Sequence, residues 1–216
     1  MRVRVKICGV RTLDDALAAE GADMLGFNFY PPSPRYVTPA ACAALVGALR
    51  DRGVRATMVG VFVNATLEDV AATLEQCDLD LAQLSGDEPP ALARALGARA
   101  FKAIRPRTLD EAHTALGAYP RRAAPPALLV DAARGRAYGG TGHLADWGLA
   151  RALAACAPIL LAGGLRPENV MDALAAVRPW GVDVASGVES APGRKDPERV
   201  AAFVRAVRQF EQEYAI

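Results

Sequence analysis

Two side chains that could exchange protons, Cys8 and Asp131, stand at the ends of short apolar runs. Cys8 closes VKIC, and Asp131 follows ALLV and precedes a long loop. A thiolate can remove a proton, and a buried carboxyl group can retain one near neutral pH for donation. If both runs are strands of one sheet, the pair could act as base and acid. The structural alternatives are a small buried cysteine and a carboxylate that hydrogen-bonds the following loop.

The stretch from residue 159 to 190 has the pattern of a phosphate site. Two apolar runs end in small residues, Gly163-Gly164 and Ser186-Gly187, and an amphipathic helix is predicted between them. Backbone N–H groups beside glycine and at helix N-termini bind phosphate. In barrels of eight strand–helix units, such sites commonly form from the loops after strands seven and eight. The alternative is that the glycines only form tight turns.

Other polar residues stand at or near predicted strand ends. Arg35 lies in YPPSPRYV, a loop stiffened by prolines, where it could hold a planar carboxylate or remain a solvated cation. Asp183 alternates with valines, so we expect a structural pairing with a buried lysine, Lys6 or Lys102. We include Lys6 among the predicted substrate-binding residues. The further strand-end candidates are Asn28, Asn64, Gln83, Ser85 and Arg105.

Alternating strands and helices must position these residues. Apolar runs predict strands at 3–8, 24–29, 56–63, 81–84, 100–104 and 127–130, and the stretch from residue 159 supplies two more. Amphipathic helices follow them, the last at 197–209. We therefore predict a single (β/α)8 TIM barrel domain over residues 1–216, with right-handed crossovers. A doubly wound open sheet would need a G-x-G-x-x-G turn, which KICGVRT lacks.

Residues 132–145 form a long glycine-rich segment, AARGRAYGGTGHLA, which we expect to be a functional loop. Asp146 is the predicted cap of the helix that follows it. The GGTGH run lacks the GK[ST] ending of a nucleotide-binding loop.

The composition excludes several classes of protein. A formal net charge of +1 with scattered basic residues gives no argument for binding nucleic acid or an anionic membrane. The four cysteines form no C-x-x-C pair, and His113 and His143 lack partners at metal-ligand spacing. No apolar run approaches the roughly 18 residues of a membrane span. We expect a cytoplasmic protein without a metal ion.

The motifs together resemble the phosphoribosylanthranilate isomerase family along the whole chain. They are VKICG at 5–9, LGFNFYPPSPRYV at 25–37, VGVFVN at 59–64, AQLSGDE at 82–88, LLVDA at 128–132, YGGTG with DW at 138–147, AGGLRPENV at 162–170 and VDVASGVES with PG and KD at 182–196. The resemblance implies a (β/α)8 barrel of tryptophan biosynthesis. It further implies an Amadori rearrangement of a small phosphosugar and no cofactor. We expect a monomer or homodimer, between which the sequence does not decide.

The resemblance also implies roles for matching residues. Cys8 would be the general base, Asp131 the general acid, and Arg35 the ligand of the anthranilate carboxylate, while the GG and SG backbones would hold the phosphate. Ser85 stands where the family's QLHG motif has histidine. The family's basic residue and TFDW are replaced by the segment 143–147, HLADW.

Two other functions remain open from the residues. Another phosphosugar barrel, such as indole-glycerol-phosphate synthase or an epimerase, is one; the synthase needs a catalytic lysine and glutamate, and no glutamate ends a predicted strand. A phosphosugar-binding barrel that has lost activity is the other, with Ser85 as its first sign.

Overall fold

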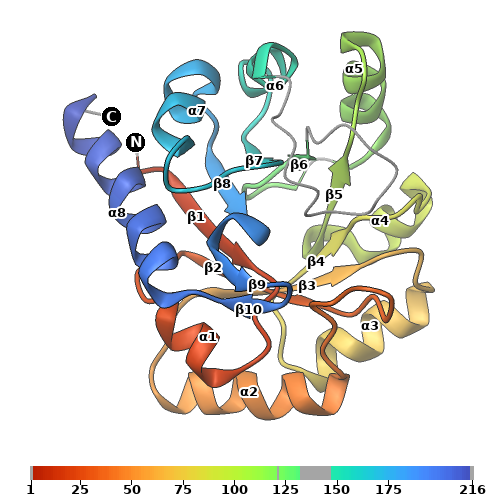
Figure 1. The fold of residues 1–216 in the computed structure, drawn as a ribbon. Coiled ribbons are helices and arrows are strands. Elements are labelled where there is room, and N and C mark those ends of the chain that lie inside the picture. The colour runs from red at the N-terminus through yellow and green to blue at the C-terminus, as the bar shows by residue number, and fades with distance from the viewer. Residues whose placement is uncertain (1, 121, 132–146, 215–216) are drawn as a thin grey trace.

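The computed structural model describes residues 2–120, 122–131 and 147–214, which form a closed barrel of parallel strands inside a ring of helices (Figure 1). Each strand pairs with the next in the sequence, and the eighth pairs with the first. The predicted (β/α)8 barrel is confirmed. The barrel strands are β1 (Arg4–Cys8), β2 (Met24–Asn28), β3 (Thr57–Phe62), β4 (Leu81–Leu84), β5 (Ala100–Ile104), β6 (Leu128–Asp131), β7 (Ile159–Ala162) and β8 (Gly181–Val184).

Helices follow the strands and cover the outside of the barrel. They are α1 (Leu13–Ala18), α2 (Pro39–Asp51), α3 (Leu67–Gln76), α4 (Pro90–Leu96), α5 (Leu109–Ala118), α6 (Trp147–Ala154), α7 (Val170–Val177) and α8 (Pro197–Glu213). Thr12, Thr38, Thr66 and Thr108 each cap a helix by accepting a backbone N–H. Thr66, rather than Asn64, caps α3. In the part of the chain described here, no helix combines the length and apolar character needed to span a bilayer.

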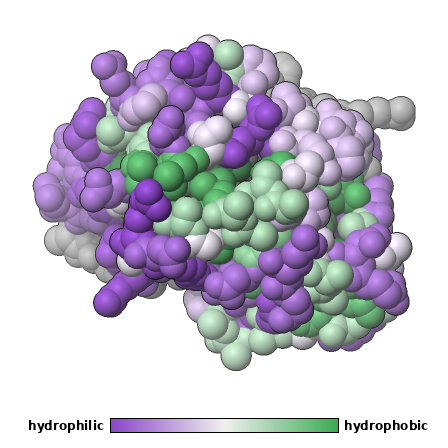
Figure 2. Space-filling view, turned by 90° about the horizontal axis from the view of Figure 1, so that it is seen from below, coloured by the Kyte–Doolittle hydropathy of each residue, from purple (hydrophilic) through white to green (hydrophobic). Residues whose placement is uncertain are grey.

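Both faces of the strands are buried, as their continuous apolar runs predict. One apolar cluster fills the barrel interior, and a larger one lies between the strands and the helices. Figure 2 shows the face below the view of Figure 1, where α2 lies: apolar residues gather near its centre and hydrophilic ones cover much of the rest.

A short hairpin after β8 is an addition that the sequence did not predict. A turn of 3-10 helix, Ser186–Val188, leads into β9 (Glu189–Ala191), which pairs with β10 (Arg194–Lys195) in antiparallel fashion. The hairpin packs closely on the 30–37 loop, because a Cβ at Gly193 would collide with the carbonyl oxygen of Pro34.

Candidate active site

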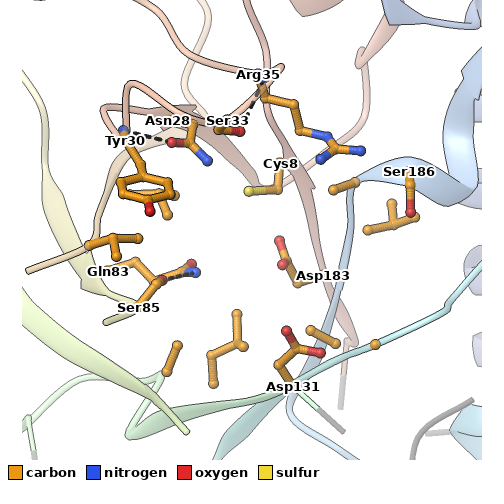
Figure 3. Close-up of a pocket in the computed structure, with 18 of the residues that line it drawn as sticks. Cys8, Asn28, Tyr30, Ser33, Arg35, Gln83, Ser85, Asp131, Asp183 and Ser186 are labelled. Atoms are coloured by element: carbon orange, nitrogen blue, oxygen red, sulfur yellow. Dashed lines mark hydrogen bonds between the residues drawn. The ribbon is translucent and has the colours of Figure 1, made fainter. Parts of the chain in front are cut away.

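A pocket opens at the carboxyl ends of the strands (Figure 3). Most of the residues predicted from the sequence line it together, namely Cys8, Arg35, Ser85, Asp131, Gly163, Gly164 and Ser186. Lys6 and Gly187 are absent from its lining. The barrel topology brings these residues to one mouth, because all eight strands run in the same direction.

Cys8, at the end of β1, stands above a buried ion pair. The Nζ of Lys6 lies 2.7 Å from the Oδ1 of Asp183, and the Lys6 side chain has no exposed surface. Burial raises the pKa of the Cys8 thiol, and the positive charge of Lys6 opposes that rise without cancelling it. Burial alone would lower the pKa of Lys6, but Asp183 and Cys8 outweigh it and raise that pKa.

This placement bears on two predictions. The pairing of Asp183 with Lys6 is confirmed, whereas Lys102 binds Glu88 at 2.8 Å. Lys6 lies beneath Cys8 and outside the pocket lining, and its role in binding substrate stays a prediction. Asp183 does line the pocket, which the structural interpretation of this residue missed.

Space for Cys8 and Lys6 comes from the neighbouring strand. Gly26 of β2 is in register with Cys8, and a Cβ there would lie 3.0 Å from the cysteine sulfur and 3.1 Å from the Nζ of Lys6. A larger residue at this position would push the thiol out of its present place. The glycine in LGFN is therefore part of the construction of the site.

Asp131 enters the pocket from the end of β6. The Nε of Arg105 lies 3.4 Å from its Oδ2, and the Asp131 side chain is 9% exposed. Figure 3 shows Asp183 between Cys8 and Asp131, so the thiol and the Asp131 carboxyl group stand on different sides of the pocket. A reacting group placed between them could receive a proton from one and lose a proton to the other.

Arg35 points into the pocket from the proline-containing loop, and Glu189 of β9 holds it. The Nε and Nη2 of Arg35 donate to the two carboxylate oxygens at 2.7 and 2.8 Å. Burial alone would lower the pKa of Arg35. Glu189 outweighs burial and raises this pKa above its ordinary value, so the guanidinium stays charged. Sequence reasoning missed Glu189, although VES directly follows the predicted phosphate loop.

The loops after β7 and β8 form the glycine-rich side of the pocket. Gly163 and Gly164 have φ values of 102° and 65°, a conformation that favours glycine. A Cβ at Gly187 would collide with the carbonyl oxygen of Leu165, so the two loops meet only because this residue is glycine. Gly187 thus lets the loop after β8 pack against the loop after β7, while Ser186 lines the pocket.

Ser85 lies beside Gln83 at the end of β4. The Nε2 of Gln83 donates to the Oγ of Ser85 at 3.0 Å. The Oε1 of Gln83 is buried and has no hydrogen-bond partner in the described part of the chain. Because Ser85 accepts from Gln83, its own hydroxyl proton can be donated elsewhere. The pair therefore offers the Oε1 of Gln83 as an acceptor and the hydroxyl group of Ser85 as a donor at the pocket.

Some predictions fall on residues that the structure does not describe: the glycine-rich segment 132–145 with His143, and the cap at Asp146. Within the described ranges, no group of three or more His, Cys, Asp or Glu side chains is arranged to hold a metal ion.

The fold and the site define a (β/α)8 barrel in which Cys8 and Asp131 share one pocket with residues of the glycine-rich loops after its last two strands. The family model for N-(5'-phosphoribosyl)anthranilate isomerase matches residues 5–206. The chain belongs to this family.

Relatives with that name support the assignment along the whole chain. The Magnetococcus marinus protein is 49% identical over 213 residues and the Myxococcus xanthus protein 49% over 216, with 97% or more of each chain covered. The crystal structure of the Thermotoga maritima isomerase has a TM-score of 0.84 at 36% identity, covering 96% of this chain and 99% of its own. A solved isomerase in complex with reduced 1-(o-carboxyphenylamino)-1-deoxyribulose 5-phosphate has a TM-score of 0.81 at 34% identity, with coverage of 96% and 99%.

Proposed function

We propose that this protein converts N-(5'-phosphoribosyl)anthranilate to 1-(2-carboxyphenylamino)-1-deoxyribulose 5-phosphate, an Amadori rearrangement of tryptophan biosynthesis. The observation that carries the proposal is the joint placement of Cys8 and Asp131 in one pocket with Arg35 and the glycine-rich loops. A rearrangement of this kind moves one proton onto the substrate and removes another, so it needs an acid and a base at separate points.

Asp131 is the proposed general acid. Its proton passes to the ring oxygen of the ribosyl group, the furanose opens, and the nitrogen lone pair forms a protonated Schiff base. Arg105, 3.4 Å from the Asp131 carboxylate, stabilises the negative charge that proton donation leaves behind.

Cys8 is the proposed general base. The Schiff base acidifies the C2' proton, and the Cys8 thiolate removes it to give an enolamine, which tautomerises to the ketone. Lys6 lies beneath the thiol and forms an ion pair with Asp183. Its positive charge stabilises the Cys8 thiolate by electrostatic attraction.

The remaining residues bind the two ends of the substrate. The Arg35 guanidinium matches the planar anthranilate carboxylate, and backbone groups at 163–164 and 186, which line the pocket, match the phosphate. The backbone of Gly187 is proposed to join them. Ser85 is proposed to contact the sugar portion together with Gln83.

Complementation of a tryptophan auxotroph that lacks this step, together with turnover of synthetic substrate, tests the function. Growth and turnover support the isomerase. A barrel that binds the product analogue without turnover would instead be an inactive phosphosugar-binding protein, and growth only in an indole-glycerol-phosphate synthase auxotroph would indicate the neighbouring reaction.

We also propose a cytoplasmic location, since a Cys8 that acts as a base must remain a reduced thiol. Either a monomer or a homodimer is compatible with this site, because the proposed catalytic and binding residues all come from one chain. Light scattering of the purified protein measures the oligomeric state.

A further inference from the structure

Glu189 connects two cations at the rim of the active-site pocket. It accepts two hydrogen bonds from Arg35, and its Oε1 also lies 3.0 Å from the Nζ of Lys195. The Glu189 side chain is 4% exposed. Burial alone would raise the pKa of Glu189. Arg35 and Lys195 outweigh burial and hold this pKa below its ordinary value, so the carboxylate stays charged.

Lys195 is buried and shares the Oε1 of Glu189 with the Nε of Arg35. Its side chain has no exposed surface, and its Nζ also donates to the carbonyl oxygen of Ala185 at 3.0 Å. Its backbone N–H donates to Asp15 of α1 at 3.2 Å, which fastens β10 to the first helix. A buried ammonium fixed by two acceptors keeps Glu189 from turning away.

The aliphatic part of the Arg35 side chain (the stem) is also held in place, as its guanidinium is. Gly9 has a φ of 81°, and a Cβ there would lie 2.6 Å from the Cδ of Arg35, so the stem passes directly over the glycine. The loop that carries Arg35 rests on Gly193 of the hairpin turn. Loop, stem and guanidinium are therefore all positioned by the hairpin and the β1 end.

The orientation of the guanidinium decides which donors face the pocket. Guanidinium presents five N–H groups in a planar fork. Glu189 takes the Nε edge, which leaves the edge formed by Nη1 and Nη2 for a second planar anion. If Glu189 were absent, Arg35 could turn its Nε edge inward or leave the pocket.

We infer that Glu189, buttressed by Lys195, is a positioning residue that fixes Arg35 so that its outer edge can bind the substrate carboxylate. This inference rests on the proposed function, and it assigns to the β9–β10 hairpin the task of presenting a preformed carboxylate receptor. The hairpin does not touch the reacting atoms; it acts through Arg35.

The test compares Glu189→Gln with Glu211→Gln. The control removes a carboxylate that accepts from Arg208 at 3.0 Å and from the backbone of Val3, which precedes β1 at the opposite end of the barrel. Glutamine at 189 would put an amide N–H against an Arg35 N–H, which breaks the fork. We expect KM to rise about tenfold to a hundredfold, the worth of one charged hydrogen bond, with a smaller change in kcat. The control should match wild type.

A binding cycle separates positioning from general loss of structure. The probes are the reduced, ring-opened product analogue, its decarboxylated counterpart and inorganic phosphate, measured by calorimetry. Glu189→Gln should weaken the carboxylated analogue only, and should add nothing in an Arg35→Ala background. Equal losses for both analogues, or additive losses with Arg35→Ala, would overturn the inference.

Lys195→Met provides a second variant if Glu189→Gln does not fold. It keeps the fork and removes the buttress together with a charge that lowers the pKa of the Cys8 thiol, so the readout is binding and not turnover. The carboxylated analogue should bind about threefold to tenfold more weakly, less than one full charged hydrogen bond. Unchanged binding would contradict the assigned role of Lys195. Failure of the proposed function is distinguishable, because it would show as wild-type protein without turnover, whereas the binding cycle reports on carboxylate capture alone.

Discussion

Ser85, which replaces the family histidine, gives the sharpest prediction. Ser85→Ala removes the acceptor for the Nε2 of Gln83, 3.0 Å away, and both ends of that buried amide then lack a partner in the described structure. A neutral hydrogen bond contributes about 0.5–1.5 kcal/mol, and an unsatisfied buried donor costs about 1–3 kcal/mol. We expect the free energy of unfolding to fall by about 1–3 kcal/mol and kcat/KM to fall by less than about tenfold.

The assay is kcat/KM against pH for wild type, Ser85→Ala and Ser85→His, with urea denaturation of each variant. Serine has no charge change near neutral pH, so Ser85→Ala should leave the shape of the profile unchanged. Ser85→His should be active and should not rescue Asp131→Asn. A loss above about a thousandfold in Ser85→Ala would refute the reasoning and make Ser85 a catalytic group. Inactive wild type restored by Ser85→His would indicate an idle binding barrel.

Three further predictions concern protons and buried charge. Cys8→Ser and Asp131→Asn should each lower kcat by about 10²–10⁴-fold while the reduced product analogue still binds, as steady-state kinetics and calorimetry can establish. Lys6→Met leaves Asp183 as a buried unpaired charge, and urea denaturation should give a loss of about 3–5 kcal/mol. Burial would raise the pKa of Asp23, but hydrogen bonds from a backbone N–H and two arginines lower it more. The ionised Asp23 carboxylate stabilises the folded protein fully above the pKa that Asp23 has in the unfolded chain, and this contribution is lost as pH falls through its lower folded-state pKa. Asp23→Asn should therefore flatten the acid side of a plot of unfolding free energy against pH.

The strands were predictable because their apolar runs are buried on both faces. Most predicted strand ends lie within one or two residues of the structure, and β4 and β5 coincide with it. The last helix continues to Glu213 rather than ending near residue 209, because Phe210 still packs in the core. The β9–β10 hairpin gave no signal, since its two strands have three and two residues and depend on contacts with the 30–37 loop.

The site was predictable where a strand end supplied the residue. Cys8 and Asp131 follow from the rule that barrel strands deliver side chains to one mouth, and the glycine-rich loops follow from their spacing. Glu189 and Lys195 lie beyond the strand, so their approach to Arg35 depends on loop geometry that no local pattern encodes. The choice of Lys6 over Lys102 for Asp183 was likewise open, because register between β1 and β8 decides it.

In the proposed mechanism, the charges around Cys8 determine which proton transfer comes first, donation by Asp131 or abstraction by Cys8. Burial raises the pKa of the thiol despite Lys6 and Lys195, so the free enzyme favours the neutral thiol. Substrate brings a carboxylate and a phosphate, which raise that pKa further, whereas the protonated Schiff base is a cation and lowers it. Asp131 must therefore act first, because its product is the charge that favours the thiolate. A cationic Schiff-base analogue should increase the thiolate absorbance of Cys8. The reduced analogue, which carries the carboxylate and the phosphate without that cation, should not increase it. Equal absorbance with both ligands would contradict this order.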